Sequence, residues 1–392
     1  MIYTPALRAV SADKKDNQPH ALATYRVDAK LHRPEIFEEI AVGQTVGAWD
    51  ERFVDPALLQ SRVAKIVSTR EIEGGYEGTI AFPWELWHGE LSWLLTLTFG
   101  KMSFYPGVCL TDLAFEEGCF ASPKLTGPKH TLQSFRAQVG ASTERPLLMG
   151  ILKPNVAMSA AALADLYAEV AHAGVQLVKD DEIRHDADFT TTLRRIEIVA
   201  NRKAKENLKT LYVVHAPIDA SAQASLKNWS EKLKSAGADA LLINVWTTGL
   251  GTLQSLRHLT ALPLMAHPAL AGALGQGQLS DSIDPAVLLG TLLRAAGADL
   301  TLFPSPYGKI GLPKATTQRI SDACRMSWPA QVLPSIPVPS AGIKPEHVPA
   351  ACRDFGRDFV LNAGTAIFAS GQSVATSAQL FLEQLEVCSR AQ

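Results

Sequence analysis

The sequence predicts a (β/α)8 barrel preceded by a smaller α+β domain. The first observation is a recurring pattern in which a glycine precedes a short apolar run, at Gly174, Gly237, Gly297 and Gly356. A single βα unit takes roughly 30 residues, and these glycines are about 60 residues apart, so each interval holds two units. The second observation is a further apolar run in each interval and one ahead of the first. Eight strands within residues 128–392 match the size of a (β/α)8 barrel.

The first part of the chain has a different pattern. Residues 1–20 are polar and are expected to form an N-terminal arm. Residues 21–127 are expected to form the α+β domain around an antiparallel sheet, because strand and helix patterns are mixed there without a regular repeat. The expected elements are strands at 21–27, 64–68 and 76–82, helices at 34–40 and 91–99, and one further strand. Gly127 and Pro128 mark the boundary.

The barrel strands are expected where apolar runs end in polar residues. An open doubly wound sheet would also use such strands, but it does not explain the count of eight. The expected strands are 147–152, 175–178, 210–214, 238–244, 262–266, 298–304, 336–339 and 357–364.

Helix signals support this strand phase. Ser159 is placed as the N-cap of a helix whose Leu163, Leu166 and Val170 share one face, and Gly174 follows its end. Asp284 and Pro285 are placed at the start of a helix over 286–296.

Composition excludes several classes of protein. The formal net charge of −2 argues against a nucleic-acid platform or a membrane-surface protein. No apolar run reaches the roughly 18 residues that a membrane-spanning helix needs, and no signal peptide is visible. The five cysteines contain no CxxC pair, which is typical of reduced thiols. A cytoplasmic enzyme without nucleic-acid or membrane partners is expected.

Charged residues follow the second barrel strand directly, as Lys179, Asp180, Asp181 and Glu182. Carboxylate oxygens suit Mg²⁺. Such a run by itself usually forms a solvated turn. Here, however, the C-terminal ends of the strands meet at one rim, where barrel enzymes place their catalytic groups. Polar residues end or follow the other strands too: Lys153, His215, Asn244, Thr247, His267, Lys309, Ser340, Asn362 and Thr365. The set favours an active site.

Small residues at the ends of strands seven and eight suggest a phosphate site. Ser340, Gly342, Gly364 and Thr365 leave backbone N–H groups open to an anion, and the loops after these two strands often bind phosphate. Tight-turn glycines would give the same pattern, so both interpretations stand.

These residues, in this order, resemble the large subunit of RuBisCO. The resemblance covers nearly the whole chain and implies a ferredoxin-like α+β domain followed by the (β/α)8 barrel. The matching segments are VGAWDERFV (46–54), AFPWELW (81–87), TFGKMSF (98–104), GILKPNVAMS (150–159), AGVQLVKDDE (173–182), LMAHPAL (264–270), PSPYGKIG (304–311), VPSAGIKPEHVP (338–349) and DFVLNAGT (358–365).

The resemblance implies a role for each rim residue. Lys179 would take up CO₂ as a carbamate, which would bind Mg²⁺ together with Asp181 and Glu182, while Asp180 would face away. Lys153 would assist enolisation, His267 would contact substrate oxygens, and Lys309 would lie on a mobile loop that closes over the site. Substrate or phosphate would be bound by Trp49, Ser340, Gly342, Gly364 and Thr365.

The sequence departs from true carboxylases at five positions. Asn155 replaces a second lysine, Pro268 replaces an arginine that binds a second phosphate, and Gly43 and Ala48 replace a glutamate and a threonine. Lys101 replaces an asparagine. The chain is therefore identified as a member of the RuBisCO-like, non-fixing branch, acting on a singly phosphorylated keto-sugar or β-keto sugar acid.

In RuBisCO-like enolases a lysine in the position of Lys101 removes the proton, and each site combines a barrel with the N-terminal domain of a neighbour. A homodimer is implied. The expected reaction is Mg²⁺-dependent tautomerisation, isomerisation or decarboxylation, with Lys101 or Lys153 moving the proton. Three alternatives are a genuine ribulose-1,5-bisphosphate carboxylase, a catalytically silent sugar-phosphate-binding relative, and a metal-free aldolase that forms a Schiff base on Lys179 or Lys153.

Overall fold

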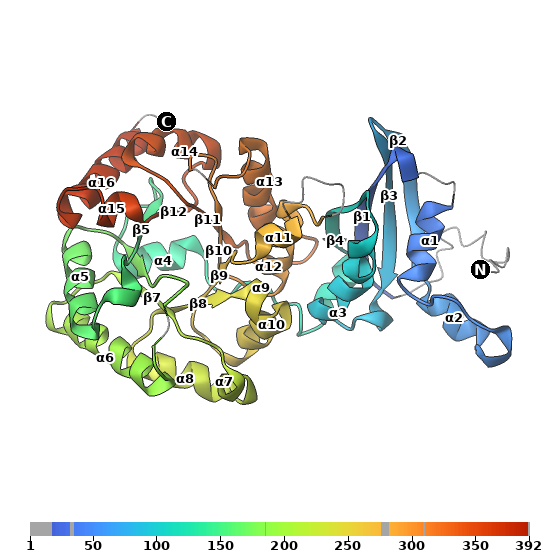
Figure 1. Ribbon diagram of the computed structural model, residues 1–392, viewed down its shortest axis with the longest axis horizontal. Helices are drawn as coiled ribbons and strands as arrows, with labels where there is room; N and C mark the ends of the chain where they lie inside the picture. The colour runs from blue at the N-terminus through green and yellow to red at the C-terminus, as the bar shows by residue number, and fades with distance from the viewer. Residues whose placement is uncertain (1–17, 32–34, 185, 276–281, 309, 391–392) are drawn as a thin grey trace. The chain divides into compact units, whose positions relative to one another are not determined.

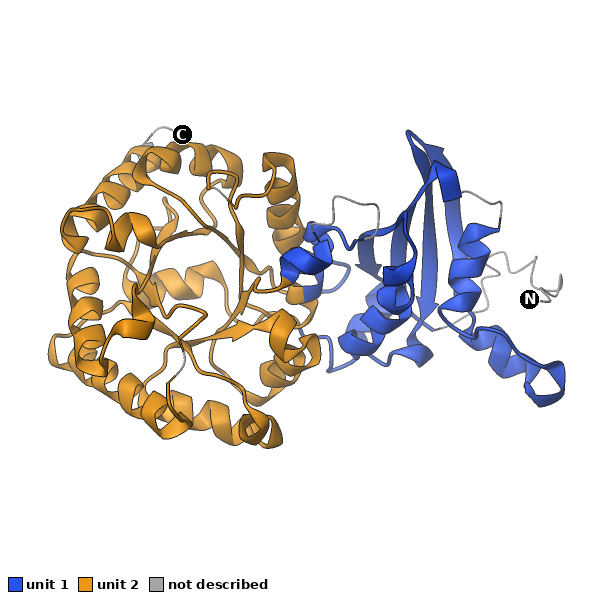
Figure 2. Cartoon of the chain, viewed as in Figure 1, with its two compact units in different colours: residues 1–126, 271–292, 327–331 blue, residues 127–270, 293–326, 332–392 orange. Residues whose placement is uncertain are grey.

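A computed structural model of the chain describes residues 18–31, 35–184, 186–275, 282–308 and 310–390. The chain forms two compact units (Figure 2). Unit 1 comprises residues 1–126, 271–292 and 327–331, and unit 2 comprises residues 127–270, 293–326 and 332–392. Most of the arm expected over residues 1–20 lies outside the described residues.

Unit 1 is built on a four-stranded antiparallel sheet with the order β2-β3-β1-β4. The strands are β1 (His20–Asp28), β2 (Lys65–Ile72), β3 (Gly75–Pro83) and β4 (Val108–Phe115). The central strand β1 buries Ala21, Ala23, Tyr25 and Val27 at every second position, as a strand with one face on the core requires. The predicted antiparallel α+β domain and its βαββαβ order are confirmed (Figure 1).

The helices of unit 1 differ in detail from the prediction. Its α-helices are α1 (Ile36–Gly43), α2 (Pro56–Arg62), α3 (Leu91–Leu95) and α11 (Ala271–Gly275). The sequence reading missed α2, although Asp55 caps it by accepting hydrogen bonds from two backbone N–H groups. The helix expected over 91–99 changes into a π-helical segment, η5 (Thr96–Gly100), and a second such segment, η9 (Val287–Leu292), lies within the helix expected over 286–296.

Unit 2 is a ring of eight parallel strands surrounded by helices (Figure 1). The hydrogen-bonded order is β11-β10-β9-β8-β7-β6-β5-β12, and β11 lies beside β12, so that the strands nearly close into a barrel. The strands are β5 (Leu147–Ile151), β6 (Leu177–Lys179), β7 (Leu211–His215), β8 (Ala240–Asn244), β9 (Leu264–His267), β10 (Leu300–Pro304), β11 (Ile336–Ser340) and β12 (Val360–Ala363). The prediction of eight barrel strands is confirmed.

Helices alternate with the strands, as expected for a (β/α)8 barrel. They are α4 (Leu132–Val139), α5 (Ala160–His172), α6 (Phe189–Lys205), α7 (Ala220–Ala224), α8 (Leu226–Ala236), α9 (Val245–Thr248), α10 (Leu250–Leu259), α12 (Leu293–Ala295), α13 (Lys314–Arg325), α14 (Val348–Phe355), α15 (Thr365–Phe368) and α16 (Val374–Arg390). Ser159 caps α5 by accepting a hydrogen bond from the Ala162 N–H at 3.2 Å, and Gly174 beyond its end has φ +90°, as predicted.

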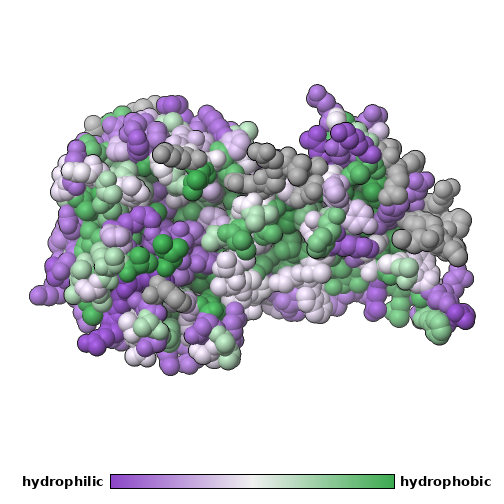
Figure 3. All heavy atoms as spheres, in the orientation of Figure 1, coloured by the Kyte–Doolittle hydropathy of each residue, from purple (hydrophilic) through white to green (hydrophobic). Residues whose placement is uncertain are grey.

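Inward-facing strand residues fill the barrel. The buried cluster includes Met149, Val213, Leu242 and Met265, and Phe135 of α4 packs against it. With the interior filled by apolar side chains, the polar residues at the strand ends gather at the rim. Hydrophilic and hydrophobic residues are interspersed on the face of the barrel that Figure 3 shows. Among the described residues, no helix has both the length and the apolar character needed to cross a membrane.

Candidate active site

Lys179 ends β6 and is fully buried. Its Nζ donates a hydrogen bond to the Asp180 carbonyl at 3.0 Å and lies 3.7 Å from Glu182 Oε2. Burial lowers the pKa of the Lys179 amine, even though Glu182, Asp181 and Asp180 act in the opposite direction. A buried lysine with a lowered pKa has a larger neutral fraction, and the neutral amine is the nucleophile that can react with CO₂ or a carbonyl.

Asp181, two residues after Lys179, pairs with Lys153. Its Oδ2 is 2.5 Å from Lys153 Nζ, which comes from the loop after β5. Asp181 is buried, whereas the Lys153 side chain is 38% exposed and so can reach the mouth of the barrel. The structure therefore brings these two predicted site residues together, although the sequence analysis assigned them separate roles.

Glu182 and His267 meet from β6 and β9. His267 Nε2 lies 3.4 Å from Glu182 Oε2, and His267 Nδ1 accepts a hydrogen bond from the Ala269 N–H at 3.2 Å. Burial, followed by the charge on Lys179, lowers the pKa of His267 well below its usual range. Burial would raise the pKa of Glu182, but Lys179 and a hydrogen bond involving Asp181 act against it and the net shift is downward. A neutral imidazole thus faces a carboxylate.

Asp180 points away from the mouth into a buried polar network, as expected. It accepts hydrogen bonds from Asn155 at 3.0 Å, from the Tyr212 hydroxyl at 2.7 Å and from the His215 backbone N–H at 3.0 Å. Arg195 completes the set with a 2.8 Å ion pair to Asp180. Asp180 lies between Lys179 and Asp181 in sequence. Its anchored carboxylate therefore holds the backbone from which these two side chains extend.

Asn155 occupies the position where the resemblance to carboxylases leads one to expect a second lysine. It is 1% exposed, and its side chain donates to Asp180 and accepts from Arg184 at 2.8 Å. Arg184 in turn pairs with Asp186 at 2.8 Å. The position therefore contributes to the buried network and presents no charge to the mouth. The roles of Arg184 and Arg195 could not be predicted from the sequence, because no local pattern marks a polar contact that is buried beneath the helices.

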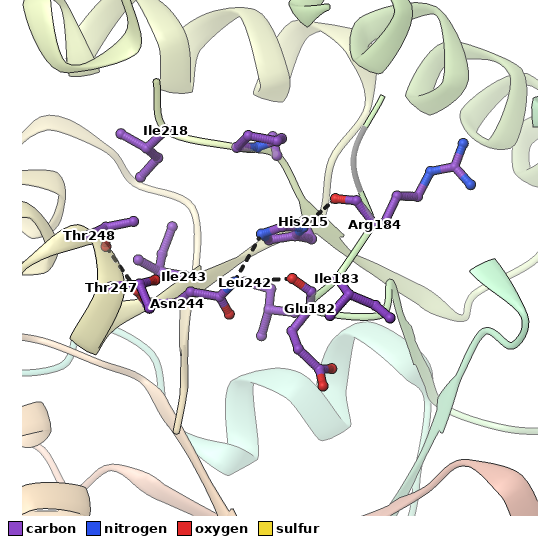
Figure 4. Close-up of a pocket in the computed structure, with 12 residues that line it drawn as sticks. Glu182, Ile183, Arg184, His215, Ile218, Leu242, Ile243, Asn244, Thr247 and Thr248 are labelled. Carbon is purple, nitrogen blue, oxygen red and sulfur yellow. Dashed lines mark hydrogen bonds between the residues drawn. The ribbon is translucent and has the colours of Figure 1, made fainter. Parts of the chain in front are cut away.

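A recess opens beside Glu182, between the ends of β6, β7 and β8 (Figure 4). His215 Nδ1 lies 3.0 Å from the Arg184 carbonyl, which can only accept, so Nδ1 carries the hydrogen. Asn244 donates to the Glu182 carbonyl at 3.1 Å and lies 3.4 Å from His215 Nε2. These side chains form one chain of hydrogen bonds along the edge of the recess. The sequence analysis had noted both residues as polar strand ends without a role.

The strand ends predicted to bind phosphate are closely packed. Ser340 Oγ accepts a hydrogen bond from Asn362 at 2.8 Å, which links β11 to β12. Gly342 has φ +72°, and a Cβ on it would lie 2.6 Å from the Gly308 Cα. A Cβ on Gly364 would lie 3.3 Å from Lys153 Cε. Glycine is therefore required at position 342, where the two loops approach each other, whereas a side chain at position 364 would crowd Ile151 and Lys153. Thr365 begins α15 and is exposed.

Two predicted site residues belong to unit 1. Lys101 is exposed and lies between η5 and a following 3₁₀ turn. A Cβ placed on Gly43 would lie 3.6 Å from Lys101 Nζ, in van der Waals contact, so this amine lies close to the end of α1. Trp49 is half-buried in the segment after α1. The remaining predicted site residue, Lys309, lies outside the described residues.

The residues at the rim fit a magnesium ion once Lys179 is modified. Among the described residues, no group of three or more His, Cys, Asp and Glu side chains is arranged to hold a metal. Asp181 and Glu182 supply two carboxylates beside Lys179, whose amine is a poor ligand for a hard cation. A carbamate on Lys179 would add oxygen donors and complete a three-residue ligand set.

Comparisons with known proteins agree with this geometry. Residues 134–390 match the family model described as "Ribulose bisphosphate carboxylase large chain, catalytic domain". The chain is 38% identical over 359 residues to a 2,3-diketo-5-methylthiopentyl-1-phosphate enolase of Bacillus velezensis, covering 88% of this chain and 87% of the relative. A similar enzyme of Exiguobacterium sibiricum is 36% identical over 372 residues, 93% of this chain and 91% of its own.

Solved structures show the same fold. The rubisco-like protein MtnW of Alicyclobacillus acidocaldarius matches with a TM-score of 0.81 and 30% identity, covering 95% of this chain and 94% of that one. The ribulose-1,5-bisphosphate carboxylase/oxygenase of Pyrococcus horikoshii matches with a TM-score of 0.82 and 22% identity, covering 94% of this chain and 89% of that one, and this likeness concerns the fold.

Proposed function

We propose that this chain, which belongs to the ribulose bisphosphate carboxylase large-chain family, enolises a 2,3-diketo-1-phosphate. The chain is an enzyme of the RuBisCO-like branch of that family. An example of the proposed substrate is 2,3-diketo-5-methylthiopentyl 1-phosphate. The observation that supports this most strongly is the buried Lys179 with a lowered pKa beside Asp181 and Glu182. The similar enzymes named for this reaction point to the diketone rather than to a sugar acid.

In the proposed reaction, a base removes a proton from a carbon next to a carbonyl, and the electron pair moves onto the carbonyl oxygen to form an enolate. Return of the proton to that oxygen then gives the enol. A magnesium ion held by the Lys179 carbamate, Asp181 and Glu182 would supply Lewis-acid stabilisation of that oxygen. His267, whose Nε2 lies 3.4 Å from Glu182, is proposed to turn this nitrogen to a substrate oxygen. Lys153 lies between this set and Gly364, where its ammonium can counter negative charge.

The other end of the substrate would carry the single phosphate. Backbone N–H groups around Ser340, Gly342, Gly364 and Thr365 are proposed to bind it, together with Trp49. Closure of the loop that contains Lys309 is proposed to exclude water.

Exchange of substrate hydrogen with solvent tests the reaction class directly. We expect Mg²⁺- and bicarbonate-dependent uptake of deuterium from D₂O into the diketone phosphate, followed by ¹H NMR. EDTA should abolish the exchange. A chain that catalyses no exchange on any diketo phosphate would contradict the proposal.

The carboxylase alternative is tested by ¹⁴CO₂ incorporation with ribulose 1,5-bisphosphate. We expect none, because Asn155 is buried in the polar network and Pro268 supplies no charge for a second phosphate. Robust fixation would favour a genuine carboxylase.

Lys101 is proposed as the proton-abstracting base, acting on the barrel of a second subunit. Mixed dimers test this arrangement. Lys101→Met and Lys179→Met chains should each be inactive as homodimers, whereas a hybrid dimer contains one site with both lysines and should recover up to about half of the activity expected for two sites. Tagged co-expression isolates the hybrid. Recovery would not occur if each site drew both lysines from one chain.

Because position 43 is a glycine, it places no carboxylate beside the Lys101 amine. In a Gly43→Glu variant the new side chain would start 3.6 Å from Lys101 Nζ and would hold it as an ammonium in an ion pair. General-base catalysis typically contributes 10²- to 10⁴-fold, so exchange should fall by about 10²-fold or more. Gly43→Gln has nearly the same size without the charge and should retain more activity. Equal losses in both variants would indicate crowding instead.

A further inference from the structure

Ala341, the residue after β11, has a left-handed backbone conformation at the proposed phosphate site. Its φ is +66°, and Gly342 follows with φ +72°. Glycine adopts this region freely, but an alanine there is strained because its Cβ approaches the backbone. A residue other than glycine keeps such a conformation only where its surroundings hold it, and such residues cluster at functional sites. The contacts of Ala341 therefore identify what holds this loop.

Ser305, which directly follows β10, contacts this loop from the neighbouring strand. It is fully buried. Its backbone N–H donates a hydrogen bond to the Ser340 carbonyl at 2.7 Å, and its hydroxyl donates one to the Ala341 carbonyl at 3.2 Å. The same carbonyl also packs against the backbone of Gly308, where an added Cβ would collide with it. The Ala341 carbonyl is therefore held against the loop after β10.

The loop after β10 is itself fixed to α14. The Tyr307 hydroxyl donates a hydrogen bond to Asp354 Oδ2 at 2.7 Å, and Lys314 Nζ lies 2.5 Å from Oδ1 of the same carboxylate. The Tyr307 ring stacks on His347, with 5.4 Å between the ring centroids. Burial, followed by the hydrogen bond with Asp354, raises the pKa of Tyr307, so its hydroxyl keeps the proton that it donates. This loop is thus a fixed support for the loop after β11.

The direction of the Ala341 carbonyl sets the direction of the next amide. In a planar trans peptide the N–H points opposite to the C=O, so the Gly342 N–H points away from the loop after β10. β11 lies between β10 and β12 in the ring, so this N–H is directed to the side where β12 ends at Gly364 and Thr365. Within the part of the chain that the structure describes, the Gly342 N–H has no hydrogen-bond partner and is available to an anion.

We infer that Ser305 is a positioning residue for phosphate binding: its hydroxyl holds the Ala341 carbonyl so that the Gly342 N–H faces the phosphate of the substrate. Ser305 is fully buried, so it acts through Ala341 rather than by contact with substrate. The inference rests on the proposed enolase function and its phosphate site, and it adds a residue of a third strand to that site.

Replacing Ser305 with alanine tests this role through the separate effects on KM and kcat. Without the hydroxyl, the Ala341 peptide can rotate out of its strained conformation, and the Gly342 N–H then turns away from the phosphate. The KM for 2,3-diketo-5-methylthiopentyl 1-phosphate, measured by deuterium exchange, should rise about 3- to 10-fold, since a neutral hydrogen bond corresponds to a factor of about 2 to 12 in an equilibrium constant. The kcat should stay within about twofold, because the metal ligands and the lysines are unchanged.

An Ala341→Gly background distinguishes positioning of this loop from a general loss of packing. Glycine adopts the left-handed conformation without strain, so the loop no longer depends on the Ser305 hydroxyl. In this background Ser305→Ala should change KM by no more than about twofold. The two substitutions would then be coupled, as expected for groups in direct contact.

Ser335→Ala is the matched control, because Ser335 makes the same kind of bond at the opposite end of the same two strands. Ser335 is buried just before β11, and its hydroxyl donates a hydrogen bond at 2.7 Å to the carbonyl of Ala298, just before β10. This variant should lower the unfolding temperature about as much as Ser305→Ala does, with KM within about twofold of the wild-type value.

Four results would contradict the inference while the enolase function stands. They are an unchanged KM in Ser305→Ala, an equal rise in KM in Ser335→Ala, a full rise in KM that persists in the Ala341→Gly background, and a Ser305→Ala chain that fails to fold, which would make Ser305 a structural residue. If the wild-type enzyme enolises no diketone phosphate, the proposed function itself fails.

Discussion

Replacing Lys179 with methionine is expected to lower Mg²⁺-dependent deuterium exchange by about 10³-fold or more. Without the amine there is no carbamate, and Asp181 and Glu182 remain as two carboxylates. Loss of the metal's stabilisation of a developing enolate corresponds to several kcal/mol, and each 1.4 kcal/mol is a factor of about 10 in rate. Methionine has a similar length and no charge, so it suits the buried position of Lys179.

Two measurements separate this result from misfolding. ¹³C NMR with ¹³C-bicarbonate should show a carbamate carbon in the wild-type enzyme and none in Lys179→Met. Thermal unfolding should show that the variant is folded. Lys232→Met, at an exposed position of α8, is the control and should keep full activity. A Lys179→Met enzyme with more than a tenth of the wild-type activity would exclude the carbamate as a metal ligand.

Replacing Arg195 with methionine is expected to destabilise the protein by about 3–5 kcal/mol. Arg195 is 1% exposed and lies 2.8 Å from Asp180 and 3.0 Å from Asp186. It also donates to the His215 carbonyl at 3.1 Å. Its loss leaves the buried Asp180 without its cation and leaves Asp186 paired with Arg184 alone. Breaking a buried ion pair costs more than an exposed pair contributes. Urea unfolding at neutral pH measures the effect.

The stability lost on replacing Arg195 is expected to be smaller at acidic pH than at neutral pH. Burial would raise the pKa of Asp186, but Arg195 and Arg184 together lower it more, so the net shift is downward. The contribution of Asp186 to stability is therefore present at neutral pH, above the unfolded pKa, and is lost as the pH falls through the folded pKa. The difference between the wild-type protein and Arg195→Met should shrink in acid.

Arg202→Met provides the matched control on the same helix, α6. The Arg202 side chain is 37% exposed and pairs with Asp165, which is 67% exposed. Exposed pairs typically contribute less than about 1 kcal/mol, so the control should lose little stability. Equal losses in the two variants would mean that Asp180 and Asp186 do not depend on a buried cation.

Much of the architecture and of the candidate site followed from the sequence alone. The repeated glycine and apolar run is a local signal, and it determined the eight barrel strands and the residues that end them. The strand count placed Lys179, Asp181 and Glu182 at the rim, and the resemblance to RuBisCO supplied their expected roles. Ring closure then brings separate strand ends together, which is why Lys153 meets Asp181 and why His267 meets Glu182.

Only the tertiary structure decided how the polar residues divide between the core and the mouth of the barrel. Arg195 looks like an ordinary helix arginine in sequence, yet it is buried against Asp180, because the helix packs over β6 and β7. Asn155 aligns with a lysine position but supports the same network. The recess beside Glu182 and the approach of Lys101 to Gly43 likewise depend on segments distant in sequence. Local patterns determine strands and their ends, whereas burial, ion pairing and empty space depend on packing between distant segments.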